Sequence, residues 1–211
     1  MYNFINDNSE KFVESFDKKS VSNYLDILKN PDQKKFKSFY GMNVARLSSD
    51  YYEKYFEILK SKKVDGKEIG KNPEKMTDDA ILVAEYLGQS SLTKDGKPKI
   101  YFSFATKLLH TINQDCPIYD SRLADFYFLP YILESDTEKK LEMYREQYDF
   151  LISEYKRIEN ENLLKPTLEL FEEEIEGFGE ISLTKKIDFI LWHVSSELRK
   201  GFLLKNSGKY K

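Results

Sequence analysis

Residues whose side chains can do covalent or acid–base chemistry are concentrated in one short segment of the chain. Residues 102–127 read FSFATKLLHTINQDCPIYDSRLADFY and include Lys107, His110, Cys116 and Asp120. A neutral amine and a thiolate beside an imidazole are both nucleophiles. A carboxylate can hold a proton or stabilise a developing positive charge. The spacing of these residues decides which of them can meet.

Apolar residues at helical spacing predict one helix in the first part of this segment and another after it. The first helix carries Lys107 beside its apolar stripe and ends near Asn113, because Pro117 disfavours the helical conformation at the residue before it. Asp120 precedes the second helix in the position of an N-cap. The stretch from Lys107 to Asn113 rises about 9 Å, and residues 114–119 can return roughly 20 Å. Asp120 can therefore reach the pocket of Lys107.

The sequence SFATK followed by CPIYDSRL resembles the helix–hairpin–helix DNA glycosylases, including the 8-oxoguanine type, over about residues 99–128. In that family a hairpin joins two helices, a lysine begins the second helix, and a P-x-D segment places an aspartate at the start of a further helix. The late segment KKIDFILW is compatible with the family's all-helical fold. The resemblance implies that a damaged base is extruded from the duplex and its sugar carbon attacked.

The resemblance also assigns roles to individual residues. Lys107 would be the nucleophile and form a Schiff base, and Asp120 would help deprotonate it and stabilise the positively charged sugar. The remaining assignments are nucleic-acid contacts for Ser103, Thr106 and Arg122, and substrate-pocket positions for His110 and Tyr119. Neither a metal nor a cofactor is implied. DNA is the expected partner, and a protein partner is compatible with the same surface.

Other interpretations of the same residues stay open. The family's glycine-rich hairpin is replaced here by IYFSFAT, and the net charge is −3. Both features favour a catalytically inactive helical module that binds nucleic acid or protein, accessory to a DNA-processing or phage-defence system. Cys116, His110 and Asp120 form a third hypothesis, a cysteine hydrolase, although a lone cysteine beside a proline is more often a small buried residue. Lys107 could also be a solvated helical lysine and Asp120 no more than a cap.

Composition and periodicity predict the fold class. The chain has 211 residues, of which 40% are hydrophobic, 15% aromatic and 33% charged, so it can bury a sizeable core. Helical spacing of apolar residues continues almost throughout, which predicts a compact all-α domain of about eight to ten helices. We expect one domain over residues 1–211, or two helical lobes that meet near residues 89–99. A short β-hairpin around Asp95 and Gly96 is the main competitor to an all-helical fold, and residues 206–211 are expected to be a frayed tail.

Composition also limits the function. A net charge of −3 excludes a globally basic nucleic-acid binder but leaves room for a local basic groove. A single cysteine excludes a zinc site built on several thiolates. The N-terminal residues lack the pattern of a signal peptide, and no apolar run approaches the length of a membrane span. We therefore expect a cytoplasmic protein without membrane association.

Overall fold

The computed structural model describes residues 1–30, 32–45 and 47–201, and these residues are mostly helical, as the sequence predicts. The α-helices are α1 (Tyr2–Asp7), α2 (Ser9–Ser15), α3 (Lys19–Lys29), α4 (Gln33–Phe39), α5 (Ser49–Ser61), α6 (Met76–Gly88), α7 (Phe102–Ile112), α8 (Ser121–Phe126), α9 (Thr137–Asn160), α10 (Lys165–Glu174) and α11 (Leu183–Arg199). Three short 3₁₀ helices are η1 (Met42–Ala45), η2 (Pro73–Lys75) and η3 (Phe178–Glu180). The described residues thus hold slightly more α-helices than expected, because several are only six or seven residues long.

The only paired strands within the described chain are two residues each. Strands β1 (Lys63–Val64) and β2 (Lys67–Glu68) are antiparallel around a turn in which Asp65 and Gly66 both have positive φ. Such a two-residue turn is typical of a tight hairpin. In the region where the sequence suggested a competing hairpin, the structure has a single antiparallel bridge between Leu92 and Pro98. An all-α class is therefore the appropriate description.

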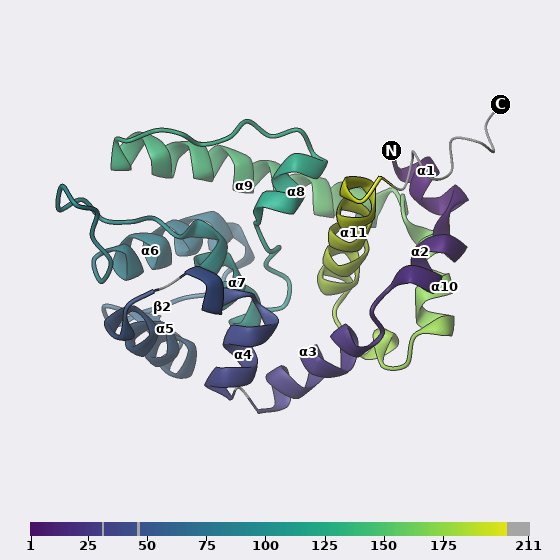
Figure 1. Cartoon of the computed structure of the whole chain (residues 1–211), viewed down its shortest axis with the longest axis horizontal. Coiled ribbons are helices and arrows are strands. Elements are labelled where there is room, and N and C mark those ends of the chain that lie inside the picture. Colours follow the sequence, from purple (N-terminus) through teal and green to yellow (C-terminus); the bar gives the residue numbers. More distant parts are fainter. Residues whose placement is uncertain (31, 46, 202–211) are drawn as a thin grey trace.

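The helices pack around two hydrophobic cores (Figure 1). The first core is built mainly by α4, α5, α6, α7 and the N-terminal part of α9. The second core is built mainly by α1, α2, α8, α10, α11 and the C-terminal part of α9. Each core buries a set of large aromatic and aliphatic side chains, which is the main favourable term for folding.

Three of the described helices, α3, α8 and α9, contribute buried residues to both cores. Helix α3 places Tyr24 in the second core and Ile27 in the first. Helix α9 places Leu151 in the first core and Tyr155 in the second. Figure 1 shows α9 along one edge of the molecule and α3 along the opposite edge, so that they tie the two halves together.

The chain does not pass from one core to the other near residues 89–99. That segment joins α6 to α7, and both of these helices pack in the first core. The chain crosses from one core to the other within α3, between α7 and α8, and within α9. Sequence periodicity could not show this, because it gives the buried face of a helix but not the core that receives it. The expected tail, residues 206–211, lies outside the described residues.

Helices α6 and α7 pack against each other in the first core and are joined by residues 89–101. The connection turns at Gly96, whose φ is +77°, and Thr93 N donates to Lys97 O at 2.7 Å. Gly88, the last residue of α6, packs so closely that a Cβ there would lie 3.2 Å from Lys99 O. Glycine therefore serves close packing at this position, which fixes the start of α7 against the end of α6.

Candidate functional site

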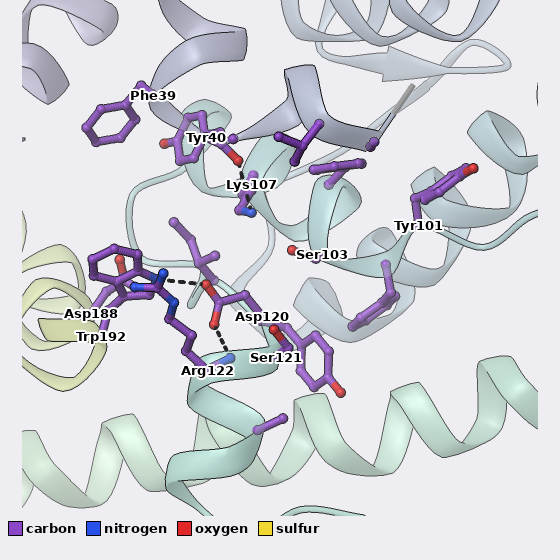
Figure 2. A pocket seen from close by; sticks show the side chains of 18 of the residues that line it. Phe39, Tyr40, Tyr101, Ser103, Lys107, Asp120, Ser121, Arg122, Asp188 and Trp192 are labelled. Atoms are coloured by element: carbon purple, nitrogen blue, oxygen red, sulfur yellow. Dashed lines mark hydrogen bonds between the residues drawn. The ribbon is translucent and has the colours of Figure 1, made fainter. Parts of the chain in front are cut away.

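A large cavity lies between the two cores. Its volume is about 1540 Å³, and its lining residues come mainly from α3, α4, α7, α8, α11 and the segment 130–133. Aromatic residues are frequent in the lining and include Phe39, Tyr40, Tyr101, Phe102, Phe104, Tyr119, Tyr144, Phe189 and Trp192. Lys107 and Asp120 both line this cavity, so the two residues that the sequence singles out are brought to one site (Figure 2).

Lys107 enters the cavity from the middle of α7. Its side chain is half-buried, and Nζ donates to the backbone oxygen of Tyr40 at 3.3 Å and lies 5.3 Å from the ring centre of Phe104. Burial lowers the pKa of Lys107, because the ammonium form loses hydration, while the nearby Asp120 carboxylate acts in the opposite direction. A lowered pKa increases the fraction of neutral amine, which is the nucleophilic form.

Asp120 is the N-cap of α8, as its position before that helix predicts. Its Oδ1 accepts from the backbone N–H groups of Arg122 at 2.9 Å and Leu123 at 3.0 Å. Its Oδ2 accepts from Trp192 Nε1 at 3.0 Å. The carboxylate therefore accepts three hydrogen bonds, which fix its orientation.

The segment between α7 and α8 is held in place by Thr106 and His110. Thr106 Oγ1 accepts from Tyr119 N at 3.1 Å, and His110 Nδ1 bonds Cys116 O at 2.8 Å. These contacts bring the chain back along α7 after that helix ends at Ile112. The predicted return of Asp120 toward Lys107 therefore has a specific structural cause.

His110 does not line the cavity, in contrast to its expected pocket position. It is completely buried, and its Nε2 bonds the hydroxyl of Tyr24 at 2.8 Å. Burial lowers the pKa of His110 to about 3, so the ring is neutral near pH 7. Its two nitrogens are occupied by structural partners, which leaves none for acid–base chemistry.

The cysteine hydrolase hypothesis does not fit this geometry. The Cys116 side chain is completely buried, and burial raises its pKa to about 12. A nucleophilic cysteine needs the opposite shift. The only hydrogen bond between His110 and Cys116 that is found within the described chain is through the backbone oxygen of the cysteine. Cys116 is thus a small core residue.

The other predicted site residues divide into two groups. Ser103, Tyr119 and Arg122 line the cavity. Thr106 is completely buried and does not, so its expected contact with nucleic acid is replaced by a structural role. Tyr119 is mostly buried, and its hydroxyl donates to Gln147 Oε1 at 2.6 Å, which orients its ring.

Trp192 on α11 is a site residue that the sequence interpretation missed. Its ring stacks against the Arg122 guanidinium, which lies 3.9 Å from the ring centre, while its N–H donates to Asp120. The side chain is 39% exposed although it lies on a helix with a wide apolar face. The sequence signal was a tryptophan near the edge of that face. It was a weak signal, because only the packing of α11 against α8 shows that Trp192 contacts Asp120.

Lys185 and Asp188 on α11 form a buried ion pair in the cavity wall. Lys185 Nζ lies 2.6 Å from Asp188 Oδ2, and the two side chains are only 3% and 7% exposed. The lysine also lies 4.3 Å from the ring centre of Phe189 and 5.0 Å from that of Tyr24. Burial raises the pKa of Asp188, and the Lys185 charge opposes this shift. The i, i+3 spacing in KKID was the sequence signal for this pair.

No protein-family model, curated protein or solved structure matches the chain. Within the described residues, no group of three or more histidine, cysteine or acidic side chains could hold a metal ion. No helix among the same residues is long and apolar enough to cross a membrane. The function must therefore be argued from the cavity and its side chains.

Proposed function

We propose that the protein is a DNA-glycosylase-like enzyme that cleaves the N-glycosidic bond of an extruded, oxidised base. The observation that carries this proposal is that Lys107 and Asp120 line one cavity between two helical cores. The cavity, at about 1540 Å³, is larger than a typical ligand pocket of roughly 300–1,000 Å³. It therefore has room for a base together with its sugar.

Lys107 supplies the nucleophile in this proposal. Its neutral Nζ donates a lone pair to C1′ of the sugar, and the C1′–N bond breaks with its electron pair leaving on the base, which takes up a proton. The attached nitrogen gives one proton to the departing base and one to O4′ as the C1′–O4′ bond breaks with its electron pair on the oxygen, which opens the sugar ring and leaves a C1′=N Schiff base. The buried environment that lowers the pKa of Lys107 favours the first step.

Asp120 supplies the carboxylate that faces the positively charged sugar. The backbone N–H groups of α8 and the Trp192 N–H hold its orientation, so little reorganisation is needed during the reaction. The aromatic side chains of the lining, Trp192 and Tyr119 among them, offer surfaces on which an extruded base can stack. Arg122 and Ser103 lie in the same cavity and are suited to hold a phosphate or sugar oxygen.

Base release from duplex DNA that contains 8-oxoguanine tests the proposal. We expect Lys107→Gln to reduce release by at least about 100-fold, because removal of a nucleophile leaves only binding and electrostatic effects. Asp120→Asn keeps a capping side chain but removes the charge and should also reduce release. Lys35→Gln is the matched control, since this lysine lines the same cavity but is largely exposed and paired with Asp26. Equal release by wild type and Lys107→Gln would refute the assignment.

A second candidate function, a catalytically inactive binding module, is favoured by the charges of the lining. The five acidic residues Asp17, Asp26, Asp32, Asp120 and Asp188 balance the five basic residues Lys34, Lys35, Lys107, Arg122 and Lys185. A cavity without net positive charge is poorly suited to collecting several phosphates. This candidate predicts that wild type binds its ligand without releasing any base and that Lys107→Gln binds equally well.

A further inference from the structure

The Lys185–Asp188 pair in the wall of the cavity carries a large desolvation penalty. Two charges that are almost completely buried lose most of their hydration, and a hydrophobic pair of similar volume is often as stable or more so. Since the pair lines the cavity, its groups can also contact whatever enters. A role in ligand recognition would explain why charge is placed there.

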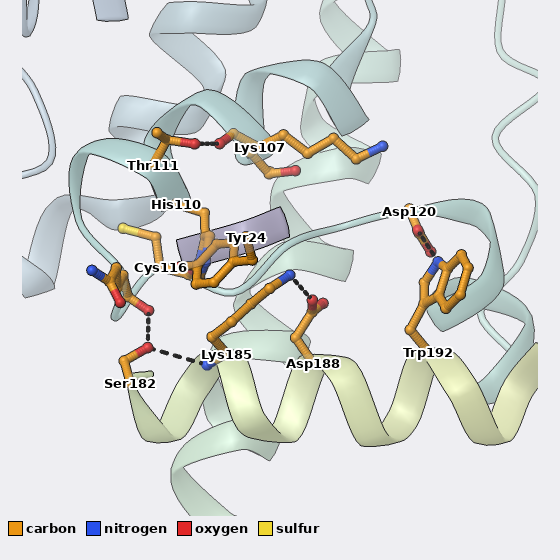
Figure 3. A network of polar contacts seen from close by, with 12 residues as sticks. Tyr24, Lys107, His110, Thr111, Cys116, Asp120, Ser182, Lys185, Asp188 and Trp192 are labelled. Atoms are coloured by element: carbon orange, nitrogen blue, oxygen red, sulfur yellow. Dashed lines mark hydrogen bonds and ion pairs between the residues drawn. The ribbon is translucent and has the colours of Figure 1, made fainter. Parts of the chain in front are cut away.

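The pair lies on the same wall as the groups that surround Asp120. Asp188 and Trp192 are one turn apart on α11, and the Trp192 N–H donates to Asp120. Figure 3 shows the side chains of Lys185 and Asp188 projecting from α11 toward the side on which Lys107 lies. The charge of Asp188 also acts on Lys107, which places the pair close to the proposed reaction centre. A base whose sugar lay between Lys107 and Asp120 would therefore have its ring near the pair.

The pair makes one hydrogen bond between its two members, and the Lys185 ammonium otherwise contacts the rings of Phe189 and Tyr24. An ammonium group has three donors, and Asp188 is the one hydrogen-bond acceptor found for Lys185 Nζ within the described chain. Asp188 accepts from Lys185 through Oδ2, and no donor to Oδ1 is found among the same residues. The pair thus presents a donor beside an acceptor, both charged.

We propose that Lys185 and Asp188 recognise the hydrogen-bonding edge of the bound base and favour a lactam edge, in which a ring N–H adjoins a carbonyl. This inference rests on the proposed function, because it takes the ligand of the cavity to be a nucleobase. Lys185 donates to the carbonyl oxygen and Asp188 accepts from the ring N–H, and both bonds are charge-assisted. Guanine-type bases add an exocyclic amine, from which the same carboxylate can accept a second hydrogen bond. Adenine and cytosine offer an amine beside a ring nitrogen, and that nitrogen is a weaker acceptor than a carbonyl.

The single tryptophan provides a direct measurement of binding. In a ¹H–¹⁵N NMR spectrum of the labelled protein, its indole N–H gives one signal, and this group lies at the cavity wall against Asp120. Titration with deoxyguanosine and deoxyuridine should shift the signal. Deoxyadenosine and deoxycytidine should bind at least about tenfold more weakly, the loss expected when charged groups lack good partners.

Variants at the pair identify the residues responsible. Asp188→Asn and Lys185→Met should each abolish the preference for lactam bases. Because a single change leaves one buried charge unpaired, the double variant Lys185→Met/Asp188→Leu is also measured, since removing both charges keeps the core apolar. Lys186→Met is the matched control, because Lys186 is the neighbouring residue on α11 and pairs with Glu172 outside the cavity lining.

The outcomes separate this inference from the proposed enzyme function. Preference for lactam nucleosides in wild type and Lys186→Met, with its loss in the double variant, supports the inference whether or not any base is released from DNA. Equal binding of all four nucleosides overturns it, and so does a preference that persists in the double variant. If wild type releases bases from DNA but binds none of the nucleosides, the inference fails while the enzyme function stands.

Discussion

Lys107 and His110 lie three residues apart on α7, yet the structure gives them different environments. Lys107 projects into the cavity, whereas His110 points into the packed interface and bonds Tyr24 and the backbone of Cys116. The sequence predicted helical neighbours, which is correct. It could not predict which of the two would face the cavity, because that depends on where α3 and the segment after α7 pack.

The buried imidazole predicts a pH dependence of stability. His110 has a pKa of about 3 in the folded protein, against about 6.5 when unfolded. Between these values the unfolded chain binds a proton that the folded protein does not, so acidification lowers the free energy of unfolding. The contribution is about 1.4 kcal/mol per pH unit below pH 6.5.

Urea unfolding from pH 7 to pH 5 measures this effect. At pH 7 we expect His110→Gln to be less stable by roughly 1–3 kcal/mol, since at least one buried partner loses its hydrogen bond. The difference from wild type should shrink as the pH falls. His193→Gln is measured alongside it, because burial also lowers the pKa of His193, so its difference from wild type should shrink in the same direction. A difference that stays constant with pH would contradict the assignment.

At the scale of elements, α8 and α11 together hold the carboxylate of Asp120. The N-terminus of α8 supplies two backbone donors and α11 supplies the Trp192 indole. The capping role was predictable, because Asp120 precedes a helical pattern after a proline-directed loop. The contribution of α11 was not predictable, since more than seventy positions separate Asp120 from Trp192 and only packing brings them together.

The aspartates that cap α8 and α9 can be compared, because one lines the cavity and the other does not. Asp120→Ala should lower the free energy of unfolding by about 1 kcal/mol, and Asp120→Asn by less, because asparagine also caps helices. Asp136 caps α9 by accepting from Lys139 N at 3.0 Å and lies outside the cavity lining. Asp136→Ala should therefore have a similar effect in urea unfolding but leave base release unchanged. Equal losses of base release in both alanine variants would show that Asp120 acts only through stability.

At the scale of the whole molecule, the cavity lies between two cores that share α3, α8 and α9. The all-α class followed from periodicity, but the two cores did not, because they combine segments that are distant in the chain. Since the shared helices contribute to both cores, we expect the halves to unfold together.

A substitution in the first core, far from the fluorescent Trp192, tests whether the two halves unfold together. Leu108 is completely buried in the first core, and Leu108→Ala should lower the free energy of unfolding by about 2–5 kcal/mol. Trp192 fluorescence, which reports on α11, should show the whole loss as a shift to lower urea concentration. Leu133→Ala is the control, because Leu133 is 90% exposed and should change stability by less than about 0.5 kcal/mol. An unshifted Trp192 transition in Leu108→Ala would mean that the halves unfold independently.

The central claim is that Lys107 attacks a sugar carbon, and borohydride trapping tests it most directly. The protein is mixed with DNA that contains an abasic site, sodium borohydride reduces any Schiff base to a stable amine, and mass spectrometry of the digested adduct identifies the modified lysine. The account predicts an adduct on Lys107 that Lys107→Gln does not form and that the control variant Lys35→Gln still forms. No adduct above the Lys107→Gln level, or an adduct on Lys185 instead, would contradict it.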